Sequence, residues 1–308
     1  MMFQTMYQTS KYNYKTLCVI NNDVLVGGSK FKVIQDKPKL KYIRYNGGKT
    51  IHVLNTVDEE EINEHSEFMI GSITEVFTGV LIFMLNAKGL LDINLSINNY
   101  IKSNDLNDFT KTTVGDLINH RGGIVWYLTH RDIDYKKVKT SNDALKIFMQ
   151  KPLVTNEIGE CRYSFMGFII LGAIIERVTG LSYVDALKKY IFEPCKMHNT
   201  NLGEPNVTMY NLDKPLKELD QQQMEKYMVN AGGGLYSSVS DMIKFAKKLP
   251  EILTPEQIKK IYEYEEKNTI SHDGFICGGS AKFKVEYTNE WKIKNIVIEF
   301  NTYTDFDY

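Results

Sequence analysis

The feature that most constrains the fold of this chain is a change of hydrophobic periodicity that occurs twice along it. β-rich runs separated by turn signals predict strands near the N-terminus at Thr16–Ile20, Val24–Val26, Leu40–Tyr45 and Thr50–Asn55. From Ser72 onward the apolar residues recur at helical spacing instead. Alternation returns in the tail, at Phe283–Tyr287 and Ile296–Phe300. Strands at both ends therefore enclose a helical middle.

Two segments of that middle are too apolar to lie on a protein surface. Residues Ile73–Leu85 and Met166–Val178 are apolar on nearly all sides and are followed by glycines that end helices. Further helices are predicted at Thr113–His120, Ser182–Tyr190 and Ser240–Leu249, and from Thr254 onward. We predict one α+β unit over residues 1–308. Its antiparallel sheet is built from both termini (about 1–70 and 255–308) and flanked by helices of an inserted region (about 72–250).

Composition excludes several classes of partner. The chain has 308 residues, of which 43% are apolar and 24% charged, as in ordinary globular proteins. Its net charge of -1 offers no electrostatic footprint for nucleic acid. We see no signal peptide pattern and no run long enough to span a membrane, and four scattered cysteines fit reduced thiols. We therefore expect a cytoplasmic protein without nucleic-acid partner, membrane span, cofactor or metal.

A tetrapeptide at the start of the first apolar helix, Ser72-Ile73-Thr74-Glu75, has a purely structural interpretation. Ser-x-x-Glu before an apolar run is typical of a capping box, in which the two side chains satisfy backbone N–H groups of the first turn. This role is the one that the residues themselves favour. It predicts that Ser72→Ala and Glu75→Ala each lose about 0.5 to 2 kcal/mol of stability.

Six segments also occur in an order that resembles the serine β-lactamase and penicillin-binding-protein superfamily. They are Phe68–Glu75, Thr113–Gly123, Tyr163–Phe168, Pro194–Thr200, Ala231–Asp241 and His272–Gly274. In that family the first segment carries Ser-x-x-Lys, the third Tyr-x-Asn, and the last His-x-Gly or Lys-Thr-Gly. Each match alone is weak, but the six in order make chance an unsatisfactory explanation. The resemblance implies a β-lactamase-like fold.

The resemblance also implies roles for individual residues. Ser72 would be the nucleophile and Tyr163 the proton shuttle, while His272 and Gly274 would form the substrate-side wall. Backbone N–H groups of Ser72 and Phe275 would stabilise the oxyanion.

Two residues depart from the family pattern. Glu75 replaces the motif lysine, and a carboxylate is a poor base whose negative charge disfavours ionisation of a neighbouring tyrosine. Phe165 replaces an asparagine that usually contacts the lysine and the substrate. These departures favour a pseudoenzyme that retains its cleft and binds a small amide or ester, a protein, or copies of itself.

Two alternatives stay open at this point. One is an active serine hydrolase acting on an ester or amide, in which Glu75 with a raised pKa serves as the base for Ser72. The other is an α+β binding protein whose motifs are coincidental, since a fold alone does not define a function.

Overall fold

The structure is a computed structural model in which the chain divides into two compact units, Met1–Pro38 and Lys39–Tyr308. In the first unit, β1 (Leu17–Ile20), β2 (Asp23–Val26) and β3 (Ser29–Phe31) form an antiparallel sheet of their own. The structure describes residues 17–20, 23–26, 29–31, 41–47, 50–55, 61–101, 111–124, 140–148, 158–203, 205–207, 210–211, 214–215, 230–260, 268–276 and 279–302.

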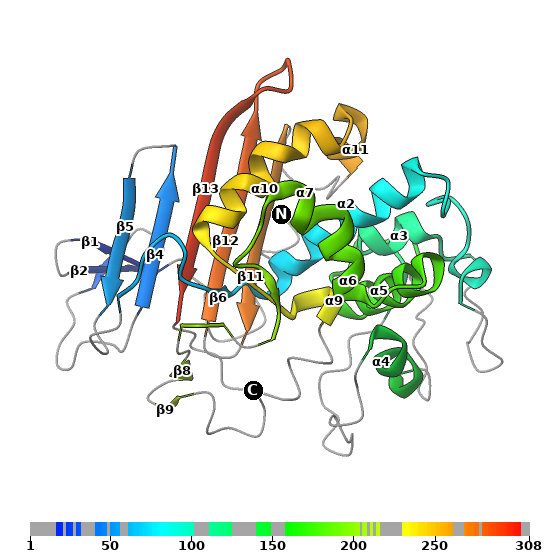
Figure 1. Cartoon of the computed structure of the whole chain (residues 1–308), viewed down its shortest axis with the longest axis horizontal. Coiled ribbons are helices and arrows are strands. Elements are labelled where there is room, and N and C mark those ends of the chain that lie inside the picture. The colour runs from blue at the N-terminus through cyan, green and yellow to red at the C-terminus, as the bar shows by residue number, and fades with distance from the viewer. Residues whose placement is uncertain are drawn as a thin grey trace. The chain divides into compact units, whose positions relative to one another are not determined.

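The second unit is built on a five-stranded antiparallel sheet whose strands come from both ends of the chain (Figure 1). The strand order is β11 (Thr269–Ile276), β12 (Gly279–Tyr287), β13 (Ile293–Asn301), β4 (Lys41–Asn46) and β5 (Thr50–Asn55). Strand β4 pairs with β13, so that Tyr45 lies opposite Ile298. The predicted α+β class, with a sheet made from both termini, is confirmed.

The two faces of this sheet differ in chemistry. Along β12 every second residue is buried, and the residues between them are partly exposed. The exposed face carries ion pairs such as Lys282 with Asp273 at 3.5 Å and Arg44 with Glu299 at 3.1 Å. Because side chains alternate along a strand, His272 of β11 is buried on the other face, which packs on the core.

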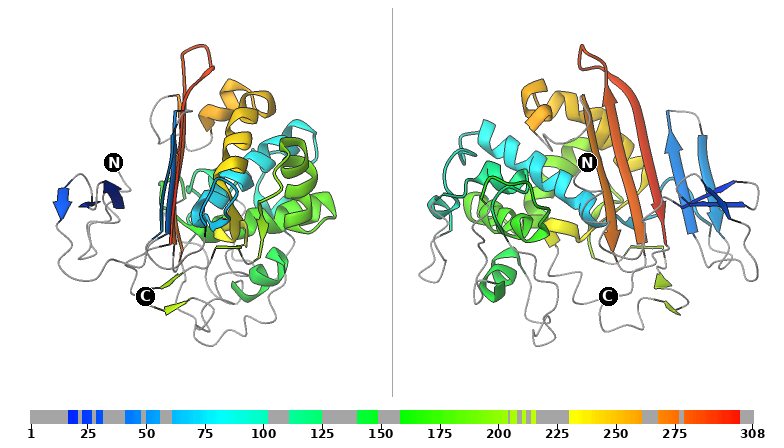
Figure 2. Two further views of the ribbon diagram at one scale, coloured as in Figure 1. Left: turned by 60° about the vertical axis from the view of Figure 1, so that its left-hand side comes forward. Right: turned by 180° about the vertical axis from the view of Figure 1, so that it is seen from behind.

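The helices gather on that core-facing side of the sheet (Figure 2). The two most apolar, α2 (Thr74–Ala87) and α5 (Phe165–Thr179), are buried on nearly all sides, as their sequences predict. Helix α10 (Val239–Ile252) packs on β13, and its Phe245 stacks on Phe77 of α2 with ring centroids 4.1 Å apart. This packing ties the start of α2 to the inner face of the sheet.

Shorter elements complete the second unit. The helices and turns are η1 (Gly71–Ile73), η2 (Ile97–Asn99), α3 (Val114–Ile118), α4 (Ser141–Phe148), α6 (Tyr183–Leu187), the π-helical turn η4 (Lys188–Phe192), α7 (Glu193–Cys195), α9 (Asn230–Gly233) and α11 (Pro255–Lys260). The strands are β6 (Phe68–Met69), β7 (Asn201–Leu202), β8 (Tyr210–Asn211), β9 (Lys214–Pro215) and β10 (Leu235–Ser237). Within the described residues no single helix is long and apolar enough to cross a membrane; a bent pair, Phe165–Thr179 with Tyr183–Cys195, reaches that length with a 73° bend.

Candidate functional site

The start of α2 differs from the predicted capping box. The helix is entered through the 3-10 turn η1, where Gly71 has a positive φ of 51°, and no side chain caps either η1 or α2. The Ser72 hydroxyl bonds Tyr163 instead, and Glu75 is fully buried. The capping-box prediction is therefore wrong, because both side chains are turned toward partners elsewhere in the chain.

A capping box does exist at the next helix, α3, where it positions a histidine. The Thr113 hydroxyl accepts the Asp116 N–H, and the Asp116 carboxylate accepts the Thr113 N–H at 2.9 Å. Two residues after the end of this short helix lies His120, a non-glycine residue with a left-handed φ of 53°. The conformation turns the imidazole inward, where only 1% of the side chain is exposed.

Thr113→Ala is expected to lower the unfolding free energy by about 0.5 to 2 kcal/mol, because it removes the cap of α3. Thr113→Ser is the matched control, since it keeps the capping hydroxyl and should stay within about 0.5 kcal/mol of wild type. Urea denaturation followed by circular dichroism measures both. Equal stability of the alanine variant and wild type would contradict the capping role.

Tyr163 is positioned by the segment that precedes α5. The Arg162 N–H donates to the His120 carbonyl and the Gly159 N–H donates to the Arg121 carbonyl, both at 2.8 Å. These bonds hold the segment beside His120. The ring centroids of His120 and Tyr163 are 4.7 Å apart. The partly exposed Tyr163 therefore stands directly in front of the buried histidine.

Strand β11 approaches η1 so closely that two glycines are required. A Cβ built on Gly274 would lie 1.9 Å from the Ile70 carbonyl oxygen, and one on Gly71 would lie 2.7 Å from the Phe275 nitrogen. The backbones of Gly71–Ser72 and Gly274–Phe275 thus lie side by side, as an oxyanion hole made by Ser72 and Phe275 requires. That role stays a prediction.

Five side chains meet at this junction in a chain of contacts. The Ser72 Oγ lies 2.7 Å from the Tyr163 Oη, and the Tyr163 hydroxyl donates to the Glu75 Oε1 at 2.9 Å. Because Tyr163 gives its one hydrogen to Glu75, Ser72 must donate to Tyr163. On its other side, the Glu75 Oε2 lies 3.4 Å from the Nε2 of His120 and 3.4 Å from that of His272.

The geometry assigns charges to this cluster. The His272 Nδ1 donates to the Asp273 carbonyl at 2.7 Å, and its Nε2 faces Glu75, so both ring nitrogens face acceptors. Burial opposes the charge, but the hydrogen bond and negative charge of Glu75 raise the pKa of His272 above its ordinary value. Burial raises the pKa of Glu75, and the contacts with His272 and Tyr163 oppose that rise. We therefore describe Glu75 and His272 as a buried ion pair.

His120 is neutral in this arrangement. Burial, followed by the charge of His272, lowers the pKa of His120 to about 3. The Ser164 N–H donates to its Nδ1 at 3.2 Å, which leaves the ring proton on Nε2, facing Glu75. In the sequence, His120 is marked only by its place in the second of the six motif segments.

The predicted site residues thus divide into two groups. The structure brings Ser72, Glu75, Tyr163 and His272 together, with Gly274 and Phe275 beside them. Phe165 is only 4% exposed and lies in the core cluster, where it would contact a Cβ added to Gly232. The catalytic and substrate-binding roles of the predicted site residues stay predictions.

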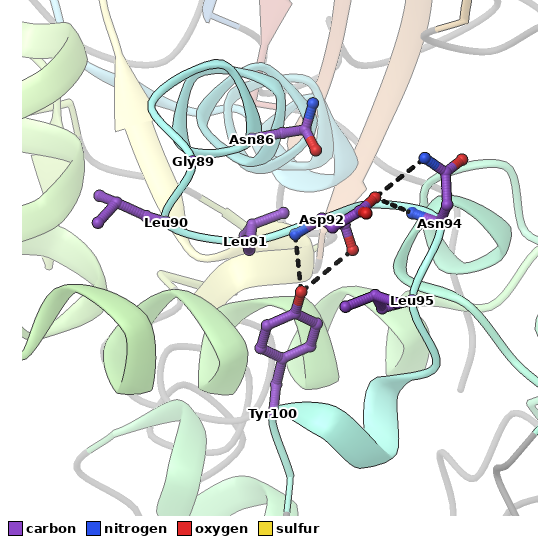
Figure 3. A pocket seen from close by; sticks show the side chains of 8 residues that line it. All are labelled: Asn86, Gly89, Leu90, Leu91, Asp92, Asn94, Leu95 and Tyr100. Carbon is purple, nitrogen blue, oxygen red and sulfur yellow. Dashed lines mark hydrogen bonds between the residues drawn. The ribbon is translucent and has the colours of Figure 1, made fainter.

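An open pocket of about 570 Å³ lies away from this cluster, after the end of α2 (Figure 3). Polar groups that line the pocket are bonded within it. The Tyr100 hydroxyl bonds the Asp92 backbone, and the Asn94 side chain donates to the Asp92 carboxylate at 2.9 Å. Among the described residues, its lining contains no serine, cysteine, histidine or lysine. We therefore place the candidate site at Ser72.

The fold agrees with comparisons to known proteins. The model of the family Beta-lactamase matches residues 35–281, and the chain belongs to this family. It is 23% identical over 242 residues to a beta-lactamase of Providencia stuartii, covering 75% of this chain and 59% of that protein. It is 28% identical over 162 residues to the mitochondrial serine beta-lactamase-like protein LACTB of Bos taurus, covering 48% and 29%.

The chain spans less than two thirds of the length of these curated relatives. Among solved structures, the octameric penicillin-binding protein homologue from Pyrococcus abyssi is similar with a TM-score of 0.67 and 22% identity, covering 87% of this chain and 70% of that one. That likeness concerns the fold.

Proposed function

We propose that this chain is a catalytically impaired member of the β-lactamase family, which keeps a serine at its cleft and binds small amides or esters without efficient turnover. The observation that supports this proposal is the bond from the Tyr163 hydroxyl to the buried carboxylate of Glu75. A tyrosine that takes a proton from serine must lose its own proton, either before the transfer or together with it. The negative charge of Glu75 opposes ionisation of the tyrosine, whereas a lysine at the same position would favour it.

The groups that face Glu75 oppose the rise in its pKa that burial causes, and so limit its strength as a base. Its two oxygens face the Tyr163 hydroxyl and the Nε2 atoms of His120 and His272. Positive charge and hydrogen-bond donors favour the ionised carboxylate over the protonated one. A carboxylate held in this way gains little by accepting a proton that originates on Ser72.

A second candidate function is an active hydrolase that uses the same atoms as a relay. The contacts of 2.7 Å and 2.9 Å form an unbroken path from Ser72 through Tyr163 to Glu75. Along it the serine proton would pass to the Tyr163 oxygen while the tyrosine proton passes to Glu75. The serine oxygen would then add to the carbonyl carbon of an ester or amide, whose π-bond pair moves to the carbonyl oxygen. Collapse of this adduct would break the ester or amide bond, and the alcohol or amine would leave with the proton held by Glu75.

One labelling experiment separates these functions. Chelator-treated wild type and Ser72→Ala are exposed to a reporter β-lactam, an activated ester and a serine-reactive phosphonate, and then weighed by intact-mass spectrometry. We expect wild-type turnover no faster than that of Ser72→Ala, because the proton path ends at a stabilised carboxylate. Turnover or a covalent mass adduct that requires Ser72 would overturn the impaired function and support the active hydrolase.

Self-association is a further part of the proposal. Its support is the octameric state named for the Pyrococcus abyssi homologue. Light scattering after size-exclusion chromatography tests it directly, and a monomer at every concentration would count against it.

A further inference from the structure

We propose that Glu75, His120 and His272 bind one divalent d-block metal ion, with Zn²⁺ as the ion that fits best. The three residues are at most 5% exposed, and one ligand atom from each lies within 4.8 Å of the other two. Two imidazole nitrogens and a carboxylate oxygen form a set that zinc uses in proteins. The oxygen-preferring ions Mg²⁺ and Ca²⁺ are poorly served by two imidazoles.

The ligand spacing favours a tetrahedral ion. The Glu75 Oε2 lies 3.4 Å from the Nε2 of His120 and 3.4 Å from that of His272. Zinc bonds of about 2.0 to 2.1 Å give a tetrahedron with edges of about 3.3 to 3.4 Å, whereas octahedral neighbours would lie about 2.9 Å apart. Two edges of the site therefore already have the tetrahedral length, with the fourth position left for water.

The second contact of His272 is that of a metal ligand. Its Nδ1 donates to the Asp273 carbonyl at 2.7 Å, which directs Nε2 at Glu75 and fixes the ring orientation. Metal-bound histidines characteristically donate their other ring N–H in this way. On binding zinc, His272 would release its Nε2 proton to solvent, since a metal takes the neutral ring.

His120 must change its tautomer to take part. In the metal-free state the Ser164 N–H donates to its Nδ1, and the ring proton lies on Nε2. Zinc bound to Nε2 would move that proton to Nδ1, where the Ser164 N–H could no longer donate. The ring would lose one backbone hydrogen bond and gain one metal–nitrogen bond. A cavity of about 10 Å³, room for about one water, is lined by His120 and Ser164.

A bound ion would also change the charge beside Tyr163. Zinc with the carboxylate of Glu75 carries a net charge of +1 next to the tyrosine hydroxyl, which lies 2.9 Å from the Glu75 Oε1. The motif lysine of the family carries the same charge three residues after the serine. The inference goes beyond the proposed function, and it holds or fails whether or not Ser72 reacts.

Calorimetric titration of the tag-free, chelator-treated chain with Zn²⁺ tests the site in the absence of substrate. We expect about one zinc per chain, and an affinity at least about 100-fold lower for His120→Ala and for His272→Ala, because loss of a ligand exceeds loss of an outer contact. The matched control is His65→Ala with His198→Ala, two exposed histidines whose removal should leave the affinity unchanged. The site would be overturned if wild type took up no zinc, or if both site variants bound zinc with the wild-type affinity.

Two further measurements keep the test decisive if an alanine variant unfolds. Glu75→Gln keeps the side-chain volume and removes the charge, and it should also weaken zinc binding at least about 100-fold. Nitrogen-15 NMR of the wild-type histidines should show the proton of His120 moving from Nε2 to Nδ1 when zinc is added. Histidine signals that zinc leaves unchanged would exclude His120 as a ligand and overturn the proposal.

Discussion

Gly274→Ala is expected to lower the unfolding free energy by more than about 3 kcal/mol, or to prevent folding. Its new Cβ would lie 1.9 Å from the Ile70 carbonyl oxygen and 2.9 Å from the carbonyl carbon. That carbonyl cannot move freely, because it accepts the Ile73 N–H while the Ile70 N–H donates to Leu235. The methyl group must therefore push β11 away from η1.

Gly79→Ala provides the matched control for this substitution. A Cβ on Gly79 would meet nothing closer than an Ile118 methyl carbon at 3.8 Å, an ordinary contact, and the position is inside α2. Alanine there should be neutral or stabilising by up to about 1 kcal/mol. Urea denaturation compares the two variants, and a Gly274→Ala protein within about 1 kcal/mol of wild type would show that β11 does not pack closely on η1.

Glu75→Ala is expected to cost about 3 to 5 kcal/mol, because it leaves the His272 charge buried without its carboxylate. Ser72→Ala should cost no more than about 1 kcal/mol, since Tyr163 keeps its bond to Glu75. Denaturation in the presence of a chelator measures both. This asymmetry distinguishes the buried cluster from a capping box, which predicts similar losses for the two variants.

A double-mutant cycle checks the cause of the larger loss. If the loss comes from breaking the ion pair, Glu75→Ala should cost much less in a His272→Ala background, with a coupling energy of about 0.5 to 3 kcal/mol. Additive losses from the two substitutions would show that Glu75 and His272 do not interact.

Much of the fold is readable from local patterns. β-rich runs predict β4 and β5, alternation predicts β12 and β13, and the apolar stretches predict α2 and α5, because each signal reflects how one regular element is buried. The order of the six motif segments also indicates the family to which the chain belongs. The separate first unit is not predicted, since strands such as Val24–Val26 look the same whichever sheet they join.

The contacts of the tetrapeptide Ser72–Glu75 could not be predicted from local sequence patterns. Its spacing suits both a helix cap and a buried polar cluster, and local patterns favoured the cap. The structure decides otherwise because the Gly71 turn opens the helix and buried partners draw both side chains away from its N-terminus. His120 and His272 lie far along the chain, and no local pattern specifies a contact between them.

The sequence by itself therefore determined the elements, the α+β class, the family and the serine at the start of α2. Only the tertiary structure decided the chemistry around that serine. Hydrophobic periodicity is a property of single elements, whereas the charge state of Glu75 depends on the desolvation, hydrogen bonds and imidazole charge that η1, α3 and β11 bring together.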